Sequence, residues 1–177
     1  AYSITELTNQ NVVVAIKANE KIQAVDGWTL SEDKLTLTKT YAENTVTNGE
    51  NVQIKDLAGN VVTVNVKISN IDNTLPVAKV AYSTSEATNK DVLVTINTNK
   101  PVQTIEGWTL SENKLTLTKT YTNNTQTEGE NVIIKDLVGN TTTVNVKVTN
   151  IDKVAPTTNV AYSITELTNQ NVVVAIK

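Results

Sequence analysis

VTVNVKIS, residues 62–69, alternates apolar and polar side chains without interruption. Its apolar residues fall on one face of an extended chain and its polar residues on the other, because successive side chains of a β-strand point to opposite sides. The same period of two recurs at residues 12–17, 35–40 and 52–55. Strands with one apolar and one polar face are typical of antiparallel sheets that bury a single side. The sequence therefore predicts two sheets packed face to face.

Turn-forming residues separate the expected strands. DG at residues 26–27 and NG at residues 48–49 supply residues that tolerate a positive φ angle, which suits tight turns. DLAGN at residues 56–60 predicts a short connection between the last two strands, and it returns as DLVGN at residues 136–140. No segment of useful length has the period of about 3.6 residues that marks a helix. We therefore expect an all-β chain.

The chain contains a long internal repeat. A shift of 80 residues aligns residues 1–80 with residues 81–160 without a gap, and 48 of these 80 positions are identical. A shift of 160 residues aligns residues 1–17 with residues 161–177, and both stretches read AYSITELTNQNVVVAIK. Neighbouring units differ while next-nearest units match. This pattern indicates a parent polymer with a 160-residue period built from two alternating modules.

The repeat also predicts the domain organisation. The expected parts are module 1 at residues 1–72, a linker at 73–76, module 2 at 77–152, and a final segment at 153–177 that holds a second linker and the opening strands of an incomplete third module. Each linker contains a proline, Pro76 or Pro156. Short linkers with proline favour a semi-rigid connection between modules.

Residues 161–177 contain the first strands of a module without the strands that would cover them. An isolated two-stranded piece is marginally stable at best in water. We expect a second copy of the chain to complete this piece in a head-to-tail fibre. On this hypothesis residues 1–17 and 161–177 occupy equivalent surroundings.

Composition excludes several classes of function. The chain has no Cys, His or Met, and all 15 of its cationic side chains are Lys against 18 carboxylates. The net charge of −3 and the absence of Arg argue against a nucleic-acid partner, and no apolar run is long enough to span a membrane. Without His or Cys the usual general bases and nucleophiles are missing, so we expect no enzymatic activity. A chain without thiols and without a visible signal peptide suits an internal piece of a secreted or surface precursor.

Several short motifs follow one another in the same order in both modules. In module 1 they are an AYS strand, a TN turn, GWTLS, KLTLTKTY, DLAGN, and a TVNVK strand that runs into NID and a proline. This order resembles the bacterial Ig-like repeats of cell-surface proteins, and the resemblance covers essentially all of both modules. It implies tandem immunoglobulin-like antiparallel β-sandwiches of about seven strands. It also implies an extracellular location, in stalks, adhesins or surface-layer proteins.

Aromatic residues give the first candidates for a ligand contact. Trp28 and Trp108 are the only indoles, and an exposed indole could stack on a sugar. Packing in or beside the core is the interpretation that we favour for both. Tyr41 and Tyr121 end an alternating strand on its apolar phase, and we expect them to close the core at a corner.

Carboxylates give the only candidate metal site. Asp72 and Asp152 lie just before the linker prolines, while Glu6 and Glu86 lie near the opening turn of each module. Calcium binds about six to eight oxygen atoms, which junction carboxylates and backbone carbonyls could supply. No dense acidic loop is present, so we expect no cofactor, with a junction calcium as the alternative. An isopeptide crosslink would need a buried Lys beside a carboxylic acid, and most Lys residues fall on outward phases.

Three functions are consistent with these observations. The favoured one is a structural repeat of a long bacterial surface or fibre protein that provides length, stiffness and mechanical resistance, with neighbouring repeats or other copies of the chain as its partners. The second is an adhesin module that binds a glycan or a host protein. The third is an accessory domain of a secreted enzyme. Near-verbatim repetition favours the first, because the other two seldom need it.

Overall fold

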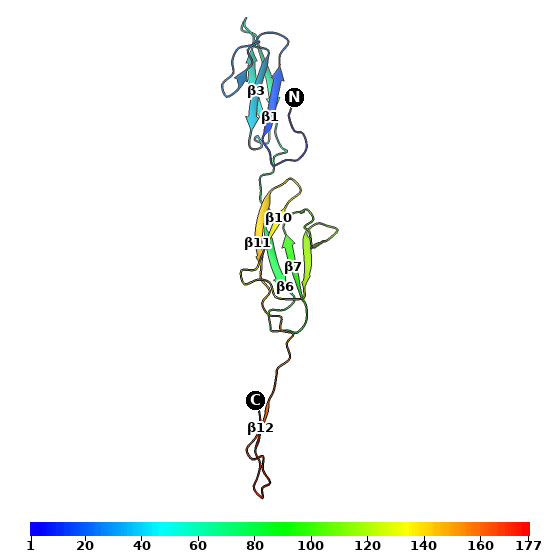
Figure 1. Ribbon diagram of the computed structural model, residues 1–177. Helices are drawn as coiled ribbons and strands as arrows, with labels where there is room; N and C mark the ends of the chain where they lie inside the picture. Colours follow the sequence, from blue (N-terminus) through cyan, green and yellow to red (C-terminus); the bar gives the residue numbers. More distant parts are fainter.

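The computed structural model describes residues 1–177 and contains thirteen strands and no helix. Two strand-rich modules and a final hairpin follow one another along one long axis (Figure 1). Every pair of named strands is antiparallel. The expectation of an all-β chain with antiparallel sheets is therefore confirmed. No helix with the length and apolar character of a membrane span occurs in the structure.

Module 1 has two small sheets that contribute to one core. The first sheet has the order β1-β3-β2 and the second pairs β4 with β5. The strands are β1 (Val12–Lys17), β2 (Thr29–Leu30), β3 (Thr36–Tyr41), β4 (Glu50–Lys55) and β5 (Val61–Val66). Eleven buried residues from both sheets form a single hydrophobic cluster, which includes Val14 of β1, Leu37 of β3 and Ile54 of β4.

Module 2 repeats this arrangement with one additional strand. Its sheets have the orders β6-β7-β9-β8 and β10-β11. The strands are β6 (Ala78–Tyr82), β7 (Val92–Thr98), β8 (Thr109–Leu110), β9 (Thr116–Tyr121), β10 (Glu130–Lys135) and β11 (Thr141–Val146). Twelve buried residues form a second cluster, which shares no member with the first. The two cores are therefore separate, and the chain passes from one to the other between Ile71 and Ala78.

The modules have five and six strands, fewer than the expected seven or so. Other extended segments pair through single bridges, such as Thr8 with Ile71 and Ile22 with Asp56. The Thr8 bridge stays short because the chain turns at once, where the backbone N–H of Gln10 donates to the Thr8 hydroxyl at 3.0 Å. Local turns of this kind limit the ladder to one residue pair.

Most of the predicted strand phases are confirmed. Val14, Leu37 and Val66 are at most 2% exposed, and their counterparts in module 2 are fully buried. Ile16 and Val64 were also expected inside, yet both are only partly buried in module 1. In module 2 the counterpart of Ile16, Ile96, is fully buried, whereas the counterpart of Val64, Val144, is only partly buried as well.

The DLAGN turn closes β4 on β5 through its own side chain. The Asp56 carboxylate accepts a hydrogen bond from the backbone N–H of Asn60 at 2.8 Å and another from its side-chain amide at 2.7 Å. Gly59 has a φ of 98°, a region that glycine occupies without a steric penalty. The turn fixes the register in which Lys55 pairs with Val61.

The final segment forms a hairpin of β12 (Val160–Tyr162) and β13 (Val174–Ile176) beyond module 2. In Figure 1 it extends away from both modules. Val172 and Val174 are 43% and 53% exposed, whereas the identical residues Val12 and Val14 are 0% and 2% exposed. Within one chain, the two copies of this sequence therefore lie in different surroundings.

Candidate functional site at the module junction

The junction between the modules is held by a lysine that the sequence analysis did not single out. Lys100 follows β7, and its Nζ lies 2.7 Å from Oδ2 of Asp72 at the end of module 1. The same ammonium group lies 3.0 Å from Oδ2 of Asp136 in module 2 and donates to the backbone carbonyl of Thr74 at 3.0 Å. Lys100 therefore joins module 1, the linker and module 2 at one point.

Asp136 is rigidly placed by the turn that follows β10. Its side chain is 2% exposed, and its Oδ1 accepts hydrogen bonds from three backbone N–H groups of the turn, those of Val138, Gly139 and Asn140, at 3.1, 2.8 and 2.8 Å. A buried carboxylate is costly unless it is paired and hydrogen-bonded. The turn and Lys100 together meet both conditions.

Asn140 adds a second bridge across the junction. Its side-chain amide donates to the backbone carbonyl of Asp72 at 2.9 Å and to the Asp136 carboxylate at 2.9 Å. Gly139 lies against module 1 as well, because a Cβ atom at this position would come within 3.2 Å of the Asn9 amide. The DLVGN turn thus serves both as a hairpin connection and as the surface that receives module 1.

The electrostatics of the junction favour the charged forms of its members. Hydrogen bonds from Lys100 and then from Thr74 lower the pKa of Asp72 to about 2. Burial acts to raise the pKa of Asp136, but hydrogen bonds from Asn140 and Lys100 outweigh it and leave the pKa lowered. The pKa of Lys100 is raised, chiefly by its hydrogen bond with Asp72. The bridge is therefore ionised over the whole neutral range.

This ionisation bears on the crosslink considered from the sequence. The Lys100 amine lies close to the Asp136 carboxylate, and the Asn140 side-chain amide donates a hydrogen bond to the same carboxylate. An isopeptide bond requires a neutral amine to attack, whereas here the raised pKa of Lys100 keeps the amine protonated. The arrangement is suited to an ion pair rather than to acyl transfer.

The candidate calcium ligands are spread over the chain. Asp72 is paired with Lys100, while Asp152 lies at the far end of module 2. The backbone carbonyls of Glu6 and Glu86 accept side-chain hydrogen bonds from Asn70 and Asn150 at 2.8 Å each, which tie the opening of each module to its end. The structure contains no group of three or more Asp, Glu, His or Cys residues placed to hold a metal ion.

The two tryptophans lie in the cores, as the packing interpretation expected. Trp28 and Trp108 are 8% and 9% exposed, so neither indole presents a free face for a sugar. Lys39 lies 5.7 Å above the Trp28 ring and forms an ion pair with Glu50 at 2.8 Å.

The two tyrosines close the same corners of the cores. The Tyr41 hydroxyl donates to Glu50 at 2.9 Å, and burial followed by this contact raises the pKa of the phenol. Tyr121 donates to Glu130 at 2.6 Å in module 2. Both cores are therefore closed at one corner by an ordered Lys–Glu–Tyr group, as the position of the tyrosines predicted.

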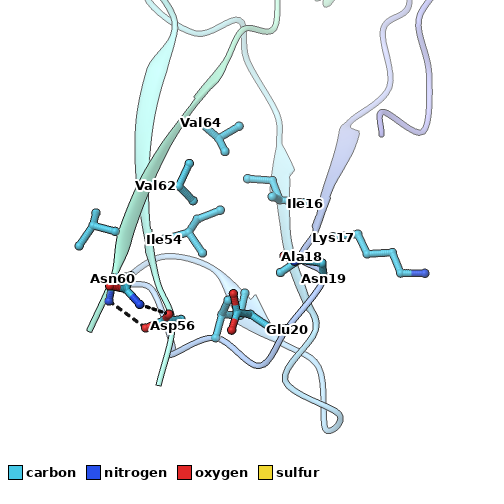
Figure 2. Close-up of a pocket in the computed structure, with 12 residues that line it drawn as sticks. Ile16, Lys17, Ala18, Asn19, Glu20, Ile54, Asp56, Asn60, Val62 and Val64 are labelled. Atoms are coloured by element: carbon cyan, nitrogen blue, oxygen red, sulfur yellow. Dashed lines mark hydrogen bonds between the residues drawn. The ribbon is translucent and has the colours of Figure 1, made fainter. Parts of the chain in front are cut away.

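The end of module 1 that faces away from module 2 contains a groove of about 490 Å³ between its sheets. Figure 2 shows Ile54, Val62 and Val64 on one wall and Ile16 on the other. Asp56 and Asn60 lie at the mouth of the groove (Figure 2). They are the counterparts of the junction residues Asp136 and Asn140 of module 2. Val61 and Val62 are 54% and 58% exposed, so the groove presents apolar surface to solvent.

One signal in the sequence could have identified the junction. At the 80-residue offset, Asp136 and Asn140 match Asp56 and Asn60, but Lys100 replaces Glu20. A reversal of charge at one position of a repeat indicates that the two modules meet different neighbours.

Comparison with protein-family models, curated proteins and solved structures found no match for this chain.

Proposed function

We propose that the chain is a structural segment of a long extracellular bacterial surface or fibre protein, in which tandem immunoglobulin-like sandwiches provide length and stiffness. The bridge from Lys100 to Asp72 and Asp136 is the observation that carries this proposal. A spacer of this kind needs modules that fold separately and junctions that resist bending. Two separate cores and one multiply bonded junction supply both.

The junction restricts bending because its contacts surround the linker. Lys100 binds Asp72 before the linker and the carbonyl of Thr74 within it. Pro76 is buried at the entry to module 2, and its ring fixes the backbone φ angle. On the module 2 side, the Val77 N–H donates to the Asn99 side chain at 2.8 Å. A linker held at each end in this way transmits orientation from one module to the next.

The proposed role needs no catalytic group, cofactor or nucleic-acid surface. Location outside the cell is part of the same proposal, and it rests on the absence of thiols and on the repeat architecture. Mechanical resistance would come from the antiparallel ladders, in which β1–β3, β4–β5, β7–β9 and β10–β11 each have six residue pairs.

The experiment compares wild-type protein with Lys100→Glu, which places the module 1 residue in the module 2 position. The chain has no Cys, so spin labels can be attached at Thr40→Cys and Thr120→Cys, two exposed positions on equivalent strands. We expect a narrow distribution of inter-label distances in the wild type and a clearly broader one in Lys100→Glu.

The matched control for this experiment is Lys153→Glu. It makes the same charge change, but Lys153 begins the segment after module 2 and pairs with Asp91 of module 2, away from the junction. This variant should keep the narrow distribution. Equal widths for Lys100→Glu and wild type would contradict the proposal, because the bridge would then not control the angle between the modules.

A further inference from the structure

One turn of module 1 contains the only Asn–Gly pair of the chain. Asn48 and Gly49 lie between β3 and β4, directly before Glu50 at the start of β4. Asn48 is exposed, and its side-chain amide takes part in no hydrogen bond, whereas the amides of Asn44 and Asn65 in the same region donate to backbone carbonyls. Asn48 is thus the one asparagine that combines a free amide with a glycine as the next residue.

The fold requires the glycine of this turn. Gly49 has a φ of 78°, a left-handed conformation that residues with a Cβ atom rarely adopt. A Cβ atom here would also lie 2.6 Å from the side-chain oxygen of Asn65 and 2.8 Å from the carbonyl oxygen of Val66. Gly129 of module 2 has the same conformation and the same close contacts. Glycine is therefore fixed at this place in both modules, and the residue before it decides the chemistry of the turn.

The two modules differ in the residue that precedes this glycine. Module 1 has Asn48, whereas module 2 has Glu128. Both are exposed, and both backbone carbonyls accept a hydrogen bond at 3.0 Å from an asparagine amide, that of Asn65 or Asn145. Asn48 is exposed even though module 2 follows module 1 directly, so a neighbouring module does not cover this turn. The two turns are matched in structure, but only the turn of module 1 offers an amide to the next backbone nitrogen.

An asparagine before a glycine can react with its own backbone. Hydroxide removes the proton of the Gly49 N–H, and the nitrogen attacks the Cγ atom of Asn48. A new C–N bond forms, the bond from Cγ to the amide nitrogen breaks, and ammonia leaves a five-membered succinimide ring. Water then opens the ring at either carbonyl, which gives aspartate or isoaspartate. Glycine favours the reaction because it has no Cβ atom to shield its nitrogen.

The same reaction is closed to the turn of module 2. The Glu128 side chain is longer by one methylene group, so attack by the Gly129 nitrogen would form a six-membered ring. Its carboxylate is also ionised at neutral pH and has no ammonia to lose. Module 2 therefore provides an internal control for the chemistry of module 1.

The folded turn slows the reaction without preventing it. The Gly49 N–H donates to the Val46 carbonyl at 2.8 Å, so the nitrogen must first be released. The backbone N–H groups of residues 46–48 donate to no acceptor, and all three residues are exposed. The population with one backbone hydrogen bond of ordinary net strength open is lower by a factor of roughly five. The turn can therefore open while the rest of module 1 stays folded.

We propose that Asn48–Gly49 is a site of self-modification, at which Asn48 converts to aspartate and isoaspartate while the matched turn of module 2 stays unchanged. The inference goes beyond the proposed structural role and does not depend on it, since the reaction needs only the folded chain and water. Aspartate gives module 1 the negative charge that Glu128 already provides in module 2. Isoaspartate, in contrast, adds a methylene group to the backbone just before β4.

The place of this methylene group matters because Glu50 is two residues away. Glu50 begins β4, pairs with Lys39 at 2.8 Å and accepts a hydrogen bond from the Tyr41 hydroxyl at 2.9 Å. Isoaspartate also moves the carbonyl at position 48, which accepts the hydrogen bond from Asn65. The modification therefore alters module 1 beside the contacts that close its core.

Peptide mass spectrometry of the full chain tests the proposal. After incubation of the folded protein at mildly alkaline pH, trypsin releases residues 40–55 and 120–135, the matched segments of the two modules. Each peptide contains three asparagines, so the second controls for deamidation outside an Asn–Gly pair. Peptide 40–55 should gain, with time, the mass that replacement of an NH2 group by OH adds. The product should elute as two species, aspartate and isoaspartate, and peptide 120–135 should not change.

Exchange of the two residues between the modules provides reciprocal variants. Asn48→Glu should abolish the mass gain of peptide 40–55, and Glu128→Asn should confer a mass gain on peptide 120–135. Both variants should fold, because each new residue already occupies this turn in the other module. Equal mass gain in the two wild-type peptides would overturn the proposal. A mass gain that persists in Asn48→Glu would also overturn it, because other asparagines would then be the source.

The rate in the folded chain shows whether the turn opens locally. Reaction of folded wild type should be roughly fivefold slower than reaction of the same chain unfolded in urea, which is the factor for one backbone hydrogen bond. No mass gain in the folded chain would overturn the proposal. A rate more than about a hundredfold slower than in urea would do the same, because the reaction would then wait for module 1 to unfold as a whole.

Discussion

Modules 1 and 2 share 48 of 80 aligned residues, yet equivalent ends of the two modules are built differently. In module 2 this end is covered by Pro76–Val80 and joined to module 1 through Lys100. In module 1 it is a groove with Glu20 at its rim. Asp136 is 1% exposed, whereas Asp56 is only partly buried. The comparison teaches that the repeat specifies each core and that the neighbouring segment decides how much of it is buried.

The largest expected difference between the modules lies at Ile96 and Ile16. Ile96→Ala should lower the free energy of unfolding of module 2 by about 3 kcal/mol, because it removes a fully buried side chain and leaves a cavity. Ile16→Ala should cost module 1 only about 1 kcal/mol, because Ile16 already borders the groove.

Urea unfolding can measure both costs through the single tryptophan of each module. Trp28→Phe and Trp108→Phe backgrounds assign the signal to one module at a time. Equal costs for the two isoleucine variants would break the comparison, since the groove would then have no energetic consequence.

The next largest effect concerns the aspartates of the two turns. Asp136→Asn should destabilise module 2 by about 2 kcal/mol. The change removes the charge that pairs with Lys100, and it weakens the hydrogen bonds that Asp136 accepts from three backbone N–H groups of the turn. Asp56→Asn should cost module 1 less, since the Asp56 side chain has solvent access and no lysine partner. Thermal unfolding of the two variants checks the order, and a larger loss for Asp56→Asn would contradict it.

A smaller effect is the pH dependence of the junction. The pKa of Asp72 is about 2 in the folded chain and 3.8 ordinarily, so the bridge contributes stability that is fully present above about pH 4. This stability is lost as the pH falls through about 2, where the folded carboxylate takes up a proton. The lowered pKa of Asp136 acts in the same direction. The difference in melting temperature between wild type and Lys100→Met should be constant from pH 7 to about pH 4 and should vanish near pH 2. A difference that stayed unchanged at pH 2 would contradict the ionic bridge.

The smallest effect should occur on the outer faces, where the modules are alike. Thr40 and Thr120 are both exposed and occupy equivalent places on β3 and β9. Each Thr→Ala change should cost less than about 1 kcal/mol, because surface substitutions remove little packing. Denaturant titration should give the same small value for both modules. A large or unequal value would show that the outer face also depends on its neighbours.

The strand phases could be read from the sequence because alternation reports which face of a sheet is buried. Leu37 and Leu117 are fully buried, as their place in the alternation predicted. The alternation contains no information on where a core ends along a strand. For this reason Val64 was predicted inside and is only partly covered, while Val66, two residues further along, is buried.

The candidate site could be predicted only in part. Asp72 was singled out because it lies before the linker proline, and the structure does place it at the junction. Its partners Lys100 and Asp136 follow it by 28 and 64 residues, and no motif connects three residues at such separations. An aspartate that binds a metal ion and an aspartate that pairs with a lysine look alike in the sequence. The sequence therefore could not decide between these two roles for Asp72.

The sequence by itself determined the all-β character, the repeat and the inward face of each strand, because these properties depend on local alternation and on turn residues such as those of DLAGN. Only the tertiary structure decided that Lys100 bridges the modules and that Asp136 is buried while its counterpart Asp56 is only partly buried. The physical reason is that burial and ion pairing belong to pairs of distant segments. Equivalent residues of the repeat therefore acquire different surroundings when different segments lie beside them.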